Sequence, residues 1–126
     1  MLKKELRLRK KSGFKEIFER GKNFSVKYAA IYIFRGKHQR FGFIASKKVG
    51  NSVQRNRAKR LLREVVRLHI SQIKPDLQII FIARTKIKGV SFAEVETSIM
   101  LMLKKANGRS VLNSDKIIFR MRKPSR

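Results

Sequence analysis

The stretch from Ser46 to Glu64 carries the side chains of this sequence that are best suited to binding phosphate. It reads SKKVGNSVQRNRAKRLLRE and holds no acidic residue before Glu64. Solvated helix faces usually mix signs, because i,i+4 pairs of opposite charge contribute about 0.2–0.5 kcal/mol each. Here cations instead stand three and four residues apart. We therefore interpret the stretch as a surface that binds nucleic-acid phosphates rather than as an ordinary solvated face.

A helix is predicted to position these cations. Asn51 or Ser52 can cap its start, and we expect it to run to about Ile73, before Pro75. Its free N–H groups and positive dipole end would lie beside the lysines that precede it. At 100° per residue, the helix has an apolar face of Ala58, Leu61, Leu62, Val65 and His69, flanks of Arg55 and Lys59, and an opposite face of Asn56, Arg60, Arg63 and Arg67. His69 is accordingly expected to be a core residue.

A second group of candidate residues is aromatic. The segment from Ser25 to Phe34 and the segment from Arg40 to Ser46 are both strand-like, and we expect two antiparallel strands joined by a short loop. Because side chains alternate between faces, one face of the first strand would hold Ala29, Ile31 and Ile33, and the other Tyr28, Ala30, Tyr32 and Phe34. Tyr32 could stack an unpaired base, which is worth about 1–3 kcal/mol, or could belong to a second half of the core. The pattern leaves both readings open.

Two further helices complete the predicted elements. The first, up to Gly21, would have Ser12 as its N-cap and Phe14, Ile17 and Phe18 on one face. The other would begin with the capping box of Ser91–Glu94 and bury Phe92, Val95, Ile99 and Leu103.

Composition and charge limit the class of protein. The chain has 126 residues and a hydrophobic fraction of 42%, which fits one folded domain. Its 33 Lys and Arg against 8 Asp and Glu give a net charge of +25, which a polyanionic partner would relieve. The charged start from Met1 to Lys11 lacks the apolar core of a signal peptide, and the apolar run Ile79–Ala83 is far shorter than the roughly 20 residues of a membrane span. We expect a soluble, cytoplasmic protein that does not bind membranes.

The same sequence offers little for catalysis by the protein itself. There is no cysteine, and His38 and His69 are the only histidines, so we expect no metal site. The eight acids are scattered, whereas phosphodiester hydrolysis at a protein metal site needs clustered carboxylates or histidines. We assign no catalytic residue to the chain.

The Ser46–Glu64 stretch resembles the signature of the protein component of bacterial ribonuclease P, with Arg55-Asn56-Arg57 in its arginine-rich helix. The order of other elements agrees, and the resemblance covers roughly Leu2 to Ala106. The agreeing elements are Arg7-Leu8, the helix from Phe14 to Phe18, Arg40-Phe41-Gly42 and Asp76 to Arg84. We therefore expect a ribonuclease P protein-like domain over residues 1–108 and a variable basic C-terminal tail over residues 109–126.

The resemblance implies an α+β fold. It would be a two-layer sandwich with a central sheet of about four strands and three helices. The strand Arg40–Ser46, the helix Asn51–Ile73 and the strand Leu77–Ala83 would form a left-handed βαβ crossover, against the usual right-handed rule.

The resemblance also implies a function: an RNA-binding subunit of the ribonuclease P holoenzyme. This endoribonuclease removes the 5′ leader from precursor tRNA by hydrolysing one phosphodiester bond and leaves a 5′-phosphate on the tRNA. The catalytic centre would be in the RNA, which would also hold most of the Mg²⁺. The partners would be the catalytic RNA and precursor tRNA.

Site residues follow from the same resemblance. The contacts to the catalytic RNA and to phosphates would be Lys47, Lys48, Arg55, Asn56, Arg57, Lys59, Arg60 and Arg63. A cleft for the single-stranded leader would be lined by Phe14, Phe18, Tyr32, Phe43 and Arg84. Ala29-Ala30 departs from the family pattern, in which bulkier residues are expected beside Tyr32.

Other classes fit less well. A ribosomal or RNA-chaperone protein would share the size and charge but would not need this arrangement of Ser46–Glu64. A protein-only nuclease would need a carboxylate cluster. A DNA-binding helix-turn-helix would need a second helix close to the recognition helix, which the pattern lacks.

Overall fold

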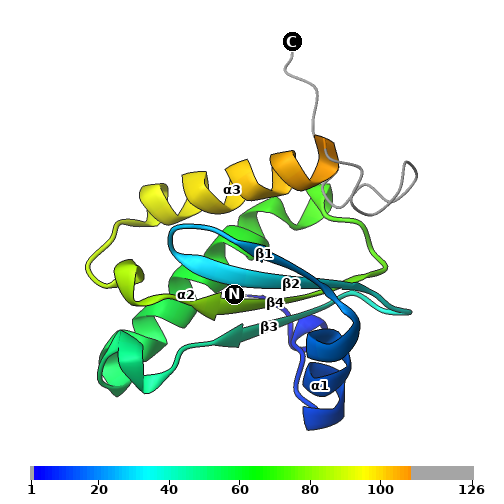
Figure 1. Cartoon of the computed structure of the whole chain (residues 1–126), viewed down its shortest axis with the longest axis horizontal. Helices are drawn as coiled ribbons and strands as arrows, with labels where there is room; N and C mark the ends of the chain where they lie inside the picture. Colours follow the sequence, from blue (N-terminus) through cyan, green and yellow to red (C-terminus); the bar gives the residue numbers. More distant parts are fainter. Residues whose placement is uncertain (1, 109–126) are drawn as a thin grey trace.

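The computed structural model describes residues 2–108, so the expected basic tail of residues 109–126 lies outside the described residues. Along the chain, three strands follow the first helix, and the fourth strand lies between the second and third helices (Figure 1). In order they are α1 (Lys11–Arg20), β1 (Lys22–Ser25), β2 (Ala29–Arg35), β3 (Arg40–Ile44), α2 (Ser52–His69), β4 (Leu77–Ala83) and α3 (Phe92–Gly108). Three helices and a four-stranded mixed sheet give the α+β fold that was predicted.

The sheet has the strand order β1-β2-β4-β3. β4 pairs antiparallel with β2 and parallel with β3, so the predicted hairpin between β2 and β3 is wrong. The physical reason is that β4 is apolar on both faces, and such a strand is best covered at the centre of a sheet. The predicted strand from Ser25 also divides: the chain turns at Val26, whose N–H donates to the carbonyl of Ala29 (2.9 Å), and β1 precedes that turn.

The two faces of the sheet are covered unequally. α2 and α3 pack together on one face, where they enclose the main core, and α1 lies on the other (Figure 1). The strands supply Ile31, Ile33, Phe41, Ile79 and Phe81 to the main core, whereas Ile17 of α1 and Ile80 are buried outside it. The helix α1 therefore covers only part of its face.

The end of helix α1 was predicted correctly, but its start was not. Its N-cap is Lys10, which makes no side-chain cap hydrogen bond, so the prediction that Ser12 caps the helix is wrong. Gly21 does end it, with its N–H donating to the carbonyl of Ile17 (2.8 Å). Ile17 is fully buried, which fixes α1 on the sheet.

Three predicted core or face assignments change at the junctions between elements. Tyr28 is buried with the main core and its hydroxyl bonds Glu94 (3.3 Å), because it precedes β2 and does not follow the alternation of that strand. His69 is not a core residue: its Nε2 lies 2.7 Å from Oε2 of Glu96, across the α2–α3 interface. Phe92 is only half-buried.

The helix α3 otherwise follows its predicted pattern. Val95, Ile99 and Leu103 are buried. Its predicted capping box is half formed: the Oγ of Ser91 accepts from the N–H of Glu94 (3.3 Å), while the carboxylate of Glu94 turns to Tyr28.

Candidate RNA interface

A short turn presents two lysines directly ahead of α2. Lys47 and Lys48 are exposed on the 3-10 turn Lys47–Val49, whose third residue is buried and anchors the turn. The Oγ of Ser46 accepts from the N–H of Lys48 (3.3 Å) and fixes the start of the turn. The two ammonium groups are thus held beside the N-terminus of α2, where an anion is favoured.

A capping box starts α2. The Oδ1 of Asn51 accepts from the N–H of Gln54, and the Oε1 of Gln54 accepts from the N–H of Asn51, both at 2.9 Å. Gly50 precedes the box with φ 146° and ψ −158°, a conformation open in practice only to glycine. The box and the glycine together set the direction in which the lysine turn meets α2.

The predicted RNA contacts on α2 lie along one side of the helix and on its flanks. Asn56, Arg57 and Arg60 are exposed, and Arg55 and Lys59 are partly exposed. Arg55 donates to the carbonyl of Gly50 (3.5 Å) and Arg57 to that of Val90 (2.8 Å). Within residues 2–108, none of the predicted cations has a carboxylate within 4.0 Å. Their charge is therefore available to an external anion.

Arg63 differs from its prediction. It is half-buried rather than on the exposed face, with its guanidinium carbon 5.5 Å from the ring centroid of Phe43. Its buried Nε has no hydrogen-bond partner among residues 2–108. Burial, followed by the positive charges of Arg7 and Arg60, lowers the pKa of Arg63 below its ordinary value. A phosphate near these three guanidinium groups would relieve that repulsion.

An apolar groove lies on the opposite face of the sheet, alongside α1. We use this name for the pocket of ≈ 630 Å³ that is lined by Lys11, Phe14, Lys15, Phe18, Glu19 and Ile44. The rings of Phe14 and Phe18 are 6.5 Å apart, and Phe18 meets Tyr32 edge to face at 4.9 Å. Phe18 is 38% exposed, an uncommon exposure for so large an apolar side chain. The structure therefore brings together three of the predicted cleft residues: Phe14 and Phe18 line the groove, and Tyr32 contacts Phe18 beside it.

Phe43 does not join them. Gly42 faces Phe14 on the α1 side, so its neighbour Phe43 must point to the other face. There its ring stacks on Phe81 (5.5 Å, 7°), beneath Arg63. Ile44, which the sequence reading did not select, occupies the groove instead.

Arg84 lies just beyond the end of β4. Its guanidinium donates to the Oγ of Ser25 (3.0 Å) and to the carbonyl of Val26 (2.9 Å). It is thus held at the β1–β2 turn, and it does not line the apolar groove.

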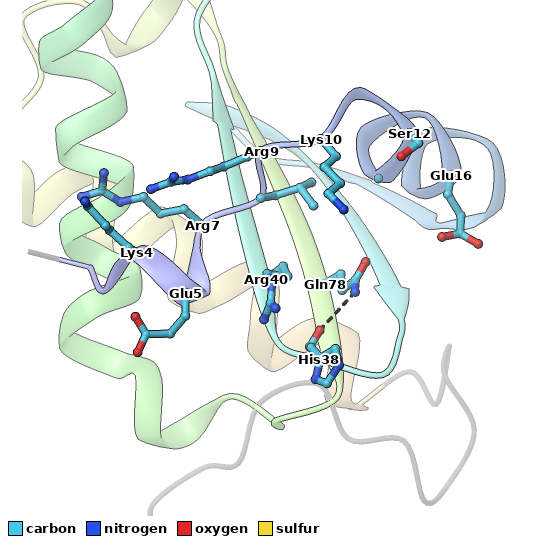
Figure 2. A pocket seen from close by; sticks show the side chains of 12 residues that line it. Lys4, Glu5, Arg7, Arg9, Lys10, Ser12, Glu16, His38, Arg40 and Gln78 are labelled. Carbon is cyan, nitrogen blue, oxygen red and sulfur yellow. Dashed lines mark hydrogen bonds between the residues drawn. The ribbon is translucent and has the colours of Figure 1, made fainter.

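The sequence reading missed a basic pocket on the other side of α1. This pocket of ≈ 680 Å³ is lined by cations of the N-terminal segment, with Arg40 and His38 opposite them. Figure 2 shows the side chains of Lys4, Arg7 and Arg9 extending toward α2, so the pocket continues the basic surface of that helix. The signal was present in the run KKELRLRKK, which composition alone assigned to a charged terminus.

Neither a metal site nor a membrane span is found in the part of the chain that the structure describes. Residues 2–108 contain no group of three or more His, Cys, Asp or Glu placed to hold a metal ion. In the same part of the chain, no helix combines the length and apolar character that a membrane span requires.

The chain is similar to known proteins along most of its length. The family model for ribonuclease P matches residues 2–107. The ribonuclease P protein component of Clostridium novyi is 40% identical over 83% of this chain and 96% of its own length. That of Clostridioides difficile is 41% identical over 79% and 90%. The structure of the Staphylococcus aureus RNase P protein superposes with a TM-score of 0.73 at 33% identity, over 80% of this chain and 94% of that one.

These matches do not favour a ribosomal or RNA-chaperone protein. The chain belongs to the ribonuclease P protein family and is an RNA-binding subunit of ribonuclease P, an endoribonuclease that acts on tRNA precursors.

Proposed function

We propose that this subunit, acting in the cytoplasm, joins two RNAs by binding one on each face of its sheet. The α2 side, with Lys47 and Lys48, binds the catalytic RNA and phosphates near the cleavage site. The apolar groove beside α1 holds the single-stranded leader of precursor tRNA. The observation that carries the proposal is the separation of two surfaces. The predicted RNA-contact cations of α2 have no carboxylate within 4.0 Å in residues 2–108, and the partly exposed rings of Phe14, Phe18 and Tyr32 lie on the opposite face.

Each surface suits its proposed ligand. Guanidinium and ammonium groups that lack carboxylate partners replace the counterions of folded RNA and give no sequence preference. Exposed rings stack unpaired bases of any identity, because every base has a π-face. A groove of this kind would accept leaders of many sequences, whereas mature tRNA has no leader to place there.

The proposal leaves bond hydrolysis to the RNA, which would also hold the Mg²⁺. The contribution of this chain is electrostatic and positional: its cations reduce the phosphate repulsion between substrate and catalytic RNA. The complex should consequently need less Mg²⁺ than the RNA alone and should bind precursor more tightly than mature tRNA.

The test is cleavage of a leader-bearing precursor tRNA at low Mg²⁺ and moderate salt. Three reactions are compared: catalytic RNA alone, protein alone, and both together. Cleavage only in the mixture is the expected result. Cleavage by the protein alone would contradict the absence of a protein active site, and a lack of stimulation would contradict the bridging role.

Arg60→Ala should weaken binding to the catalytic RNA and flatten the dependence of log K on log salt by about one unit, because one phosphate contact is lost. The measurement is a binding titration of full-length protein with ribonuclease P RNA at several salt concentrations. Arg20→Ala is the matched control, since it removes the same charge from an exposed site on α1 that is paired with Glu16 (3.2 Å). An unchanged slope for Arg60→Ala would remove Arg60 from the interface.

Tyr32→Ala should weaken binding of precursor tRNA by about 5- to 100-fold, the loss expected for one base–aromatic stack. Binding of mature tRNA and of the catalytic RNA should stay the same. Tyr32→Phe keeps the ring and should bind precursor nearly as tightly as the parent chain. If Tyr32→Ala weakens assembly with the catalytic RNA as much as precursor binding, Tyr32 has only a structural role.

A further inference from the structure

A third pocket lies where α2, the first residue of α3 and the N-terminal segment meet. Its volume is ≈ 570 Å³. One wall is apolar and consists of Leu2, Leu61 and Phe92, while Arg57, Arg60 and Arg63 lie around it. The proposed function uses the arginines but gives no role to the apolar wall.

The aromatic residue of this wall is held in place from two sides. Phe92 opens α3, whose start is fixed by the hydrogen bond from the N–H of Glu94 to the Oγ of Ser91 (3.3 Å). The guanidinium of Arg57 donates to the carbonyl of Val90 (2.8 Å) and so ties α2 to the segment before α3. The ring of Phe92 packs partly against the core and keeps the rest of its surface accessible. The pocket is therefore preformed.

The charge around the pocket is positive in spite of an acidic residue on its lining. Glu64 accepts hydrogen bonds from the Nε of Arg67, at 3.0 and 3.1 Å to its two oxygens. Arg57 and Arg60 have no carboxylate within 4.0 Å in the described part of the chain. An apolar wall beside unpaired guanidinium groups matches a ligand that joins a flat apolar-faced ring to a negative charge, as a nucleotide does.

We infer that this pocket takes an unstacked base of ribonuclease P RNA, with its ring against Phe92 and its adjoining phosphate on Arg57 and Arg60. Unpaired bases that leave the stack are commonly bound on aromatic side chains in this way. The catalytic RNA is the source because the pocket is built on α2, across the sheet from the groove proposed for the leader. The inference rests on the proposed role of α2.

Two substitutions at Phe92 separate stacking from packing. Phe92→Leu keeps an apolar side chain but loses the π-face, and should weaken binding of full-length protein to ribonuclease P RNA by about fivefold or more. Phe92→Tyr keeps the π-face and should bind nearly as tightly as the parent chain. Leu101→Ala is the control on the same helix, since Leu101 is 54% exposed and lies outside the pocket. Thermal unfolding of each variant reports whether the fold is intact.

A crosslink identifies the RNA directly and does not depend on the stability of a truncated side chain. Benzoylphenylalanine at position 92 of the full chain should react on irradiation with ribonuclease P RNA in the holoenzyme. A crosslink to the precursor instead, or equal affinities for the Phe92→Leu and Phe92→Tyr proteins, would overturn the inference. If Arg60→Ala weakens binding to ribonuclease P RNA and Phe92→Leu does not, the inferred base pocket is wrong while the proposed role of α2 stands. If neither substitution weakens binding, the proposed role of α2 is wrong as well.

Discussion

Gly50→Ala should lower the free energy of unfolding by about 2–4 kcal/mol and weaken assembly with the catalytic RNA. Part of the cost is backbone strain, about 1–3 kcal/mol for a residue with a Cβ in this conformation. The rest comes from Gln54, because a Cβ on Gly50 would lie 2.0 Å from its Oε1. Gln54 would have to move and give up the N–H of Asn51, which costs about 1 kcal/mol of helix capping.

The functional effect follows from the position of the glycine. Lys47 and Lys48 lie on one side of Gly50 and α2 on the other, so a change in its backbone reorients the lysines relative to the helix cations. An RNA backbone that contacts both the lysines and the α2 cations would then lose some of its phosphate contacts. Weaker binding to ribonuclease P RNA should therefore accompany the loss of stability.

Urea unfolding at fixed salt measures the first effect, and Gly89→Ala is its matched control. Gly89 also has a positive φ, of 71°, but a Cβ there would have no heavy atom of the described residues within 4 Å. Gly89→Ala should thus show strain alone, about 1–2 kcal/mol. In a Gln54→Ala background the cost of Gly50→Ala should fall by the capping contribution. Equal costs at Gly50 and Gly89 in the parent chain would contradict the role of Gln54.

The sequence predicted those elements that local signals specify. The cap of α2, the stop at Gly21 and the apolar run of β4 each act within a few residues. The stop and the apolar run were found as predicted, and Asn51 is the cap of the two candidates, Asn51 and Ser52. Alternation also placed Ile31 and Ile33 in the core and Tyr32 on the other face, because strand geometry fixes parity locally.

Pairing between strands could not be predicted in the same way. β2 and β3 are close in sequence, yet β4 lies between them, and that choice depends on covering both faces of β4. The face on which Phe43 lies could not be predicted for a related reason. Its type suited the cleft, but strand alternation places it on the face opposite to Gly42. The approach of Phe14 to Gly42 and the stacking of Phe43 on Phe81 show which face that is.

The α2 assignments show a similar limit. A helical wheel places Arg63 opposite the apolar stripe. The wheel does not include neighbouring elements, and here the edge strand β3 packs against α2. Phe43 of that strand provides a ring under the guanidinium, and Arg63 is half-buried as a result. The basic pocket around Arg7 and Arg40 was missed because it joins segments distant in sequence.

Gly42→Val should disrupt leader binding while leaving assembly with the catalytic RNA largely intact. A Cβ on Gly42 would lie 2.7 and 2.9 Å from two ring atoms of Phe14, so the Phe14 ring must shift, and the larger valine side chain should displace α1 with it. Overpacking of this kind costs about 1–3 kcal/mol. It would also misplace Phe18 relative to Tyr32, now 4.9 Å apart, and distort the apolar groove. The α2 surface lies on the other face and keeps its own core.

Affinities for precursor tRNA, mature tRNA and ribonuclease P RNA measure the outcome, together with urea unfolding. The affinity for precursor tRNA should fall most of the way to that for mature tRNA, because the difference between the two affinities is assigned to the leader. Adding Phe14→Ala to Gly42→Val removes the colliding ring, so stability should recover in part. Precursor affinity should not recover, since Phe14 is itself a wall of the groove. A Gly42→Val protein that keeps its preference for precursor tRNA would show that the leader binds elsewhere, because the substitution distorts the groove while it leaves every α2 cation in place.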